Sequence, residues 1–234
     1  MQKLSLFIVC GLLMPKLLFA GEFYTDFERN FRYVVPYKHN TTKEAVERSD
    51  GVLTVTIEPG MFGASSDRSN GKERAELGIS LSDRDVWVRQ EFRVRAQSGF
   101  PTNSRVMISQ IKFSDAPKGF GSPPIAVYMS QGGAVKCNDY SSGHPSQDHH
   151  RLRGVRLDDG NWHSVVMELV ISDTAGLCRV VVDGRTMIEM KGIDTHQNGK
   201  DLVGRIGPYR DQLSVTQVVQ FDDWKVQSYP KLAR

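Results

Sequence analysis

Three segments of the sequence place two polar side chains at a spacing of two or four residues, which puts them on one face of a β-strand. Guanidinium, ammonium and amide groups bind carboxylates, and a phenol can give or take a proton. Such groups side by side on a sheet would suit acid–base chemistry on an acidic substrate. The pairs are Arg74 and Glu76, Gln110 and Lys112, and Arg205 and Tyr209.

The last pair lies in the heptapeptide 205–211, where Gly207 stands between Arg205 and Tyr209. Glycine inside a strand weakens it and often marks the close approach of a ligand or of another backbone. We expect an open patch between the cation and the phenol. A core strand with one surface arginine and one half-buried tyrosine has the same pattern, so the rest of the chain decides between the two interpretations.

Together, the three segments resemble the signature strands of the jelly-roll polysaccharide lyases. The best match is to the heparin-lyase-I-like group, whose relatives include jelly-roll alginate and glucuronan lyases. The resemblance covers roughly residues 63–226 and depends on the order of the motifs, because no single motif is specific. The segments that carry it are Arg74–Leu77, Gln110–Lys112, Gly160–His163, Asp183–Gly184, Arg205–Tyr209 and Phe221–Val226.

The resemblance implies cleavage of a uronic-acid polymer by β-elimination, in which an enolate-like species forms as a proton leaves the ring carbon beside the carboxylate. Groups that neutralise the carboxylate stabilise that species. By resemblance, Tyr209 is the acid and in some relatives also the base, and Arg205 holds its phenol near ionisation and binds substrate charge. Gln110 and Arg74 face the carboxylate. Glu76 orients Arg74.

The resemblance does not identify the general base, because the family usually has histidine where this chain has Lys112. Lys112 could be the base if burial and nearby arginines depress its pKa strongly. Otherwise it neutralises the carboxylate and Tyr209 makes both proton transfers. A third option takes the base from His144, His149 or His150. In a fourth, the site only binds.

These histidines lie in a polar stretch, residues 131–159, that is long for a compact domain and suggests a functional loop or lid. Their spacing invites a zinc site, but no second cluster supplies further ligands, so we expect no catalytic metal. The implied chemistry needs no cofactor. Asp222 and Asp223 could help to hold a structural calcium, as in some jelly rolls, although two acids do not establish one.

Net charge alone makes no case for a polyanionic partner, because the 234-residue chain carries a formal charge of only +3. The positions of the basic residues are more informative, since many fall in strands or loops that could meet. We expect them to bind an anionic polysaccharide rather than nucleic acid, with Arg205 and Arg210 contacting substrate. The set is Arg68, Lys72, Arg74, Arg89, Arg93, Arg95, Lys112, Arg205 and Arg210.

The elements that must position these groups are strands. Period-two alternation predicts them at 52–58, 74–79, 85–95, 105–113, 124–129, 162–171, 177–190 (a hairpin around Asp183-Gly184), 203–209 and 217–226. Val106 and Ile108 are expected on the side of Gln110 and Lys112, and residues 42–48 could make two helical turns. Many short strands favour an all-β sandwich or jelly roll. The resemblance implies a concanavalin-like jelly roll, with two antiparallel sheets and a concave binding groove.

Residues 1–20 are predicted to be a secretory signal peptide cut after Ala20, or else an uncleaved anchor. The remaining residues, 21–234, are expected to form one domain that is secreted or periplasmic, monomeric and not in a membrane. An exported chain can join Cys137 and Cys178 in a disulfide, the alternative being two buried thiols.

Two other functions are open. A non-catalytic carbohydrate-binding sandwich of lectin or laminin-G type would share the Trp162-His163 strand and the hairpin, but it has no need for the paired polar strands. A glycoside hydrolase of similar shape would carry two glutamates on one strand face, and the chain has no Glu-x-Asp-x-x-Glu motif. Convergence of Arg74, Gln110, Lys112 and Tyr209 on one groove would favour a lyase.

Overall fold

The structure is a computed structural model that describes residues 21–28, 37–40, 45–81, 85–98, 105–116, 122–129, 132–142, 146–197, 199 and 202–230. The predicted signal peptide lies outside these residues, as does His144. No helix in the described segments is long and apolar enough to cross a membrane.

The regular elements of the described residues are β-strands. They are β1 (Gly21–Thr25), β2 (Tyr37–Asn40), β3 (Val46–Ser49), β4 (Val52–Ile57), β5 (Lys72–Arg74), β6 (Glu76–Ser80), β7 (Asp85–Ser98), β8 (Val106–Phe113), β9 (Ile125–Tyr128), β10 (Ala134–Asp139), β11 (Ser146–Arg151), β12 (His163–Val170), β13 (Gly176–Val182), β14 (Arg185–Ile193), β15 (Leu202–Asp211) and β16 (Gln217–Pro230).

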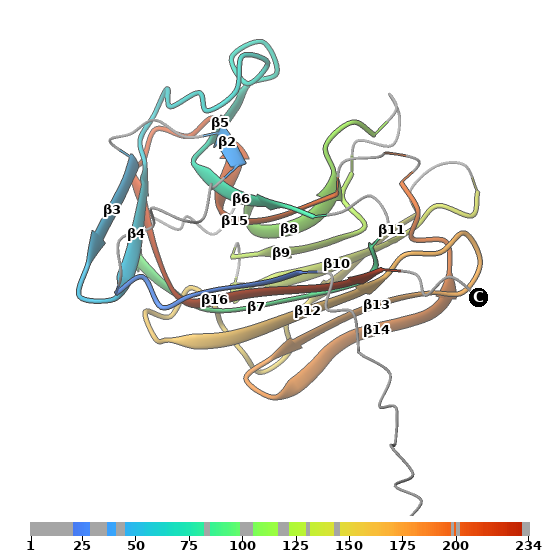
Figure 1. Ribbon diagram of the computed structural model, residues 1–234. Coiled ribbons are helices and arrows are strands. Elements are labelled where there is room, and N and C mark those ends of the chain that lie inside the picture. The colour runs from blue at the N-terminus through green and yellow to red at the C-terminus, as the bar shows by residue number, and fades with distance from the viewer. Residues whose placement is uncertain are drawn as a thin grey trace, which may run out of the picture.

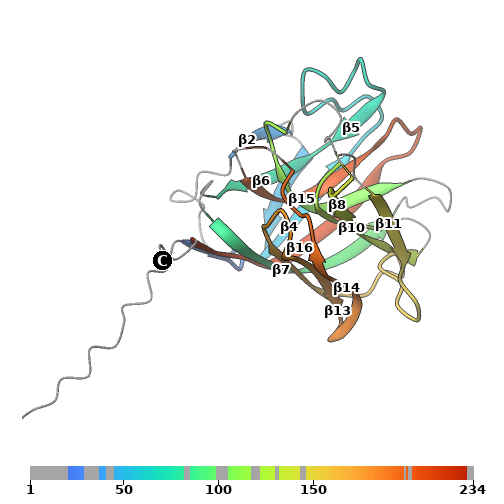
Figure 2. The same ribbon diagram turned by 90° about the vertical axis from the view of Figure 1, so that its right-hand side faces the viewer.

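These strands form two eight-stranded sheets, and the paired strands run antiparallel. The β7 sheet has the order β14-β13-β12-β7-β16-β4-β3, with β1 also paired to β16. The β8 sheet has the order β11-β10-β9-β8-β15-β6-β2, with β5 also paired to β15. Figures 1 and 2 show the two sheets facing each other. The predicted all-β sandwich of two antiparallel sheets is therefore confirmed.

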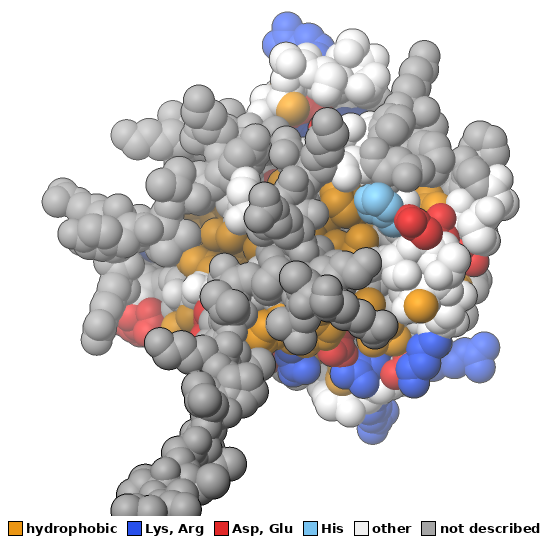
Figure 3. All heavy atoms as spheres, turned by 45° about the vertical axis from the view of Figure 1, so that its right-hand side comes forward, with side chains coloured by type: hydrophobic (Ala, Val, Ile, Leu, Met, Phe, Trp, Pro, Cys, Tyr) orange, Lys and Arg blue, Asp and Glu red, His pale blue; other side chains and the backbone are white. Residues whose placement is uncertain are grey.

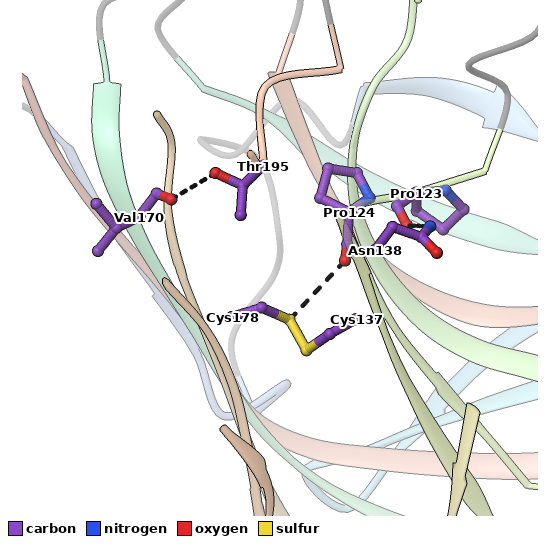
Figure 4. The surroundings of a disulfide bond; sticks show 7 residues. All are labelled: Pro123, Pro124, Cys137, Asn138, Val170, Cys178 and Thr195. Carbon is purple, nitrogen blue, oxygen red and sulfur yellow. Dashed lines mark hydrogen bonds between the residues drawn. A yellow bond between two sulfur atoms is a disulfide. The ribbon is translucent and has the colours of Figure 1, made fainter. Parts of the chain in front are cut away.

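The core lies between the sheets because alternate residues of each strand are apolar and point inward. Leu53, Val55 and Ile57 of β4 are fully buried, as the alternation predicts. Apolar side chains are visible between the two layers in Figure 3. A disulfide joins Cys137 of β10 to Cys178 of β13 and so links the two sheets (Figure 4).

Two expectations about local structure are wrong. Residues 46–49 form the edge strand β3, paired with β4, where two helical turns were considered. A helix of two turns is marginal alone, and strand pairing supplies more hydrogen bonds. The stretch 131–159, expected to be one long loop or lid, contains the two strands β10 and β11. Only two inward residues of β10, Val135 and Cys137, carry the apolar alternation, so the strand is hard to see in the sequence.

A β-bulge changes which residues of β8 face outward. The pairing of β8 with β9 shifts register between Met107 and Ser109. Val106 and Ile108 consequently face the core, while Gln110 and Lys112 face away from it, so the expectation that Val106 and Ile108 share their face is wrong. A bulge adds one residue to a strand and so reverses the alternation beyond it.

A second irregularity lies in β15, opposite this bulge, between Ile206 and Tyr209. Gly207 there has a φ of 117°, and a β-carbon added to it would overlap the carbonyl oxygen of Ala75 and lie 2.9 Å from the Cα of Glu76. The backbone between β5 and β6, and not open space, therefore occupies the place of the missing side chain. The Ala75 N–H donates to the Pro208 carbonyl at 2.9 Å and holds the two backbones together.

Replacing Gly207 with alanine should destabilise the protein by about 3 kcal/mol or more, because backbone strain and a backbone overlap coincide. The control is Gly71→Ala, which has a φ of 62° with no atom within 4 Å and should cost about 1 kcal/mol. Urea unfolding of both variants measures the difference. Equal losses would show that the β5–β6 backbone does not demand glycine at position 207.

Candidate active site

The face of the β8 sheet that is turned away from the core carries a groove of about 290 Å³. Most of its described residues are polar, and six of them are lysine or arginine against a single acid, Asp211. Such an excess of positive charge suits an anionic ligand. The lining residues are Lys72, Arg74, Arg105, Met107, Gln110, Lys112, Ser122, Pro123, Tyr128, Lys136, Tyr209, Arg210 and Asp211.

Strand register places the groove residues in rows across the sheet. In one row Tyr209 of β15 is paired with Arg74 of β5 on one side and with Met107 of β8 on the other. A neighbouring row runs from Arg205 through Gln110 and Ala126 to Lys136. The three segments identified in the sequence are therefore neighbours in the sheet.

The buried carboxylate of Glu76 joins these segments. Its side chain is 2% exposed, and Oε1 accepts a hydrogen bond of 2.5 Å from Gln110 Nε2. Oε2 accepts from Arg205 Nη1 at 3.1 Å and lies 3.5 Å from Arg74 Nη1. The expectation that Glu76 orients Arg74 holds only in part, because Glu76 contacts Gln110 and Arg205 more closely.

Arg74 is held mainly by Asp67, a fully buried residue that the sequence analysis missed. Arg74 Nε donates to Asp67 Oδ2 at 2.8 Å, and Arg74 Nη2 lies 2.5 Å from Asp67 Oδ1. The guanidinium carbon then lies 4.1 Å from the ring centre of Tyr209, in cation–π contact. The one available signal was that Asp67 is the only acid in the loop 60–72.

The phenol of Tyr209 is held protonated rather than near ionisation. Burial raises its pKa, and the nearby charges of Arg74 and Lys72 only partly counter that effect. Arg205, predicted to be the cation that acts on this phenol, instead pairs with Glu76. A protonated phenol at the groove can give a proton.

The pKa of Lys112 is shifted in the opposite direction from that of Tyr209. Burial, followed by the charge of Arg205, lowers the pKa of its ammonium group, and the Glu76 carboxylate only partly counters this. No ion pair joins Lys112 to a carboxylate in the described part of the chain. A lysine of lowered pKa can supply the neutral amine that a base requires.

Arg210, predicted to contact substrate, is among the residues that line the groove, but its guanidinium is turned into the protein. Its side chain is fully buried, with Nη2 2.7 Å from Glu73 Oε2 and Nε donating to the same oxygen at 2.8 Å. Side chains alternate along β15, so Arg210 points to the opposite side from Tyr209. The pair joins β5 to β15 and supports the site from below.

The predicted basic cluster is divided between the two sheets. Arg89, Arg93 and Arg95 lie on β7, in the sheet that does not carry the groove, so the expectation that they meet Arg74 and Lys112 is wrong. Figure 3 shows lysine and arginine side chains along the lower edge of the molecule, the side of the β7 sheet. Which sheet a strand joins depends on pairing between distant segments, and alternation within the strand does not reveal it.

The calcium considered at Asp222 and Asp223 stays a prediction. Arg93 Nη1 lies 3.1 Å from Asp222 Oδ2 and 3.9 Å from Asp223 Oδ2, so a cation already faces both acids. No cluster of three or more metal-binding side chains occurs within the described ranges.

The remaining histidine candidates lie on the edge strand β11. His149 is paired with Lys136 of β10 and His150 with Val135, which places His149 at the end of the row that contains Gln110. Their roles, like that of His144, stay predictions.

Seven lining residues were not predicted, namely Arg105, Met107, Ser122, Pro123, Tyr128, Lys136 and Asp211. Lys136 was missed because its strand was taken for a loop. Its place between the inward residues Val135 and Cys137 is the signal that could have shown it facing the groove.

Comparison with known proteins agrees with this geometry. Residues 23–225 match the family model described as "Polysaccharide lyase". The fold is similar to an endo-β-1,4-glucuronan lyase from Trichoderma reesei (TM-score 0.59, 17% identity, covering 88% of this chain and 94% of that one). It is also similar to an alginate lyase from Pseudomonas aeruginosa (TM-score 0.57, 16% identity, 81% and 88%). A search of curated proteins found no match. The resemblance to jelly-roll polysaccharide lyases is confirmed, and the heparin-lyase-I-like group stays a prediction.

Replacing Glu76 with glutamine should cost about 3 kcal/mol of unfolding free energy, because the charges of Arg205 and Arg74 would lose a buried counter-charge. The control is Glu91→Gln, which removes a partly exposed partner of Arg89 on β7 and should leave stability near the wild-type value. Urea unfolding at neutral pH compares the two. A Glu76→Gln variant as stable as the control would rule out this carboxylate as the link between the strands.

Proposed function

Since the chain belongs to the polysaccharide lyase family, we propose that it cleaves a uronate-containing anionic polysaccharide by β-elimination, with Tyr209 as the acid and Lys112 as the base. The observation that carries this proposal is the convergence of polar groups from β5, β8 and β15 on one groove rich in positive charge. A phenol that stays protonated and an amine that loses its proton easily lie in the same groove.

In the proposed reaction Lys112, as a neutral amine, takes the proton from the ring carbon next to the uronate carboxylate. The electrons of that C–H bond form a double bond to the adjacent ring carbon, whose bond to the glycosidic oxygen breaks. Tyr209 gives its proton to the departing oxygen, and both side chains then exchange protons with water. Arg205 and Gln110 neutralise the carboxylate and stabilise the enolate-like species.

The shifts in pKa favour Lys112 over Tyr209 as the base. A phenol whose pKa is raised by burial is protonated before the reaction and can only donate. A lysine whose pKa is lowered by burial and by Arg205 reaches its neutral form at a lower pH than a free lysine. A loop histidine is the alternative base.

The other two functions fit the groove less well. A purely binding domain has no need for the buried ion pairs of Asp67 and Glu76 beneath a half-buried tyrosine. A glycoside hydrolase needs two available carboxylates. The one acid among the described lining residues, Asp211, pairs with Lys72, and Glu76 is buried among its donors.

Export is part of this proposal. The apolar segment at residues 4–14 is typical of a signal peptide, and a disulfide between the sheets suits an oxidising compartment. We place the mature chain in the periplasm or outside the cell, as a monomer.

Incubation with alginate, glucuronan and glycosaminoglycans should yield unsaturated uronyl ends, detected by ultraviolet absorbance, from at least one polymer. Tyr209→Phe should lower the rate roughly 100-fold or more because the leaving oxygen loses its acid. Tyr24→Phe, on exposed β1 of the other sheet, is the matched control and should keep the wild-type rate. Binding without any product by the wild-type protein would instead identify a carbohydrate-binding domain.

The pH profile of kcat/KM should have an alkaline optimum. The rate rises with pH as Lys112 loses its proton, at a pKa below its ordinary 10.5, and falls as Tyr209 loses its own, at a pKa above its ordinary 10.0. Lys112→Arg should abolish activity, because arginine stays protonated. A rising limb centred near pH 6.5 would assign the base to a histidine and contradict this role of Lys112.

A further inference from the structure

We infer that Lys136, with Ser122 and Arg105 beside it, forms a second carboxylate-binding subsite in the groove, for a uronate that adjoins the reacting sugar. The inference rests on the proposed function and narrows the substrate to a polyuronate, a chain in which neighbouring sugars both carry carboxylates. Lys136 comes from β10 and Ser122 from the segment before β9, outside the row of Tyr209, whereas Arg105, just before β8, lies against Tyr128 in that row and so connects the subsite to the Tyr209 end of the groove.

The burial of Lys136 without an acid is the first observation. Lys136 is 2% exposed, and its Nζ donates to the hydroxyl oxygen of Ser122 at 2.5 Å. Among the ion pairs of the described residues none includes Lys136. Lysine is almost never so buried unless paired, because a charge removed from water needs a counter-charge. A bound carboxylate would supply it.

The charge around Lys136 is the second observation. Arg105 lies near enough to act on it, and burial, followed by Arg105, lowers the pKa of Lys136 to about 8. The ammonium form therefore still predominates at neutral pH. The guanidinium of Arg105 lies 5.0 Å from the ring centre of Tyr128, in the adjoining row of the groove. Lys136 and Arg105 line the same groove, so an acidic sugar bound there would face two cations.

The position of Lys136 along the groove is the third observation. It lies in one row with Gln110, with Ala126 of β9 between them, so their Cα atoms are separated by two strand spacings, roughly 9–10 Å. Ala126 contributes only a methyl group to the space between them. Gln110 and Arg205 serve the reacting carboxylate, which leaves Lys136 for another one on the same chain.

The test measures binding of alginate and glucuronan tetrasaccharides by calorimetry, in a Tyr209→Phe background that does not consume them. Lys136→Met should raise Kd roughly tenfold, the loss of one charge-assisted contact. The matched control, Lys191→Met on β14 of the other sheet, should stay within twofold. With carboxyl-reduced, neutral tetrasaccharides, Lys136→Met should change Kd less than twofold. Circular dichroism verifies that each variant is folded.

An unchanged Kd for the acidic oligosaccharides would overturn the subsite. An equal loss with the neutral ones would also overturn it, because it would show a role in packing. The lyase proposal is tested separately by product formation in the wild-type protein. If no polymer yields unsaturated ends but the binding differences appear, the subsite stands and the chemistry fails. If unsaturated products form but Kd does not depend on Lys136, the lyase proposal stands and the subsite fails.

Discussion

The site depends on one buried carboxylate. Glu76 holds a negative charge where water cannot reach it, and this is tolerated because donors from three strands surround it. In satisfying Glu76, Gln110, which lines the groove, and Arg205, which is paired with Gln110, are drawn to fixed positions. Lys112 and Lys136 pair with no carboxylate in the segments that the structure describes. Internal acids thus fix some of the cationic and amide groups, and the charge that is left over is available to an anionic ligand.

The β7 sheet supports strands β8 and β15 from the core side. Gln90 of β7 reaches across the sandwich, where its Nε2 donates to the hydroxyl of Ser109 at 2.6 Å and to the backbone carbonyl of Arg205 at 3.0 Å. Gly204 leaves room for it, since a β-carbon there would overlap Gln90 Oε1. The contact lies where both β8 and β15 shift register. A bulge re-aims side chains only if its backbone is held, and here two sheets hold it.

How much the sequence could predict depends on the range over which each feature is encoded. Alternation is local, so it predicted most strands, the core of β4 and the pairs of polar residues expected on one strand face. It also implies that Arg210 faces away from Tyr209, an inference available from the sequence but not drawn. The bulge in β8 leaves no periodic signal in the sequence, so the sequence analysis assigned Ile108 to the wrong face of the strand. The pairing of Arg74 with Asp67 depends on how the loop 60–72 folds, and the division of the arginines between two sheets depends on contacts between distant segments. Alternation encodes neither.

A single physical factor, burial, favours both protonation states that the proposed reaction needs. Burial disfavours the charged form of any group, so it raises the pKa of the Tyr209 phenol and lowers that of the Lys112 ammonium group. Substrate would disturb this arrangement, because a bound carboxylate beside Lys112 favours its protonated form. Arg205 counters that effect, since its charge already lowers the pKa of Lys112 and can be shared with the carboxylate. In the proposed reaction, neutralising the substrate would therefore have two effects: it would acidify the proton to be removed, and it would keep Lys112 able to remove it.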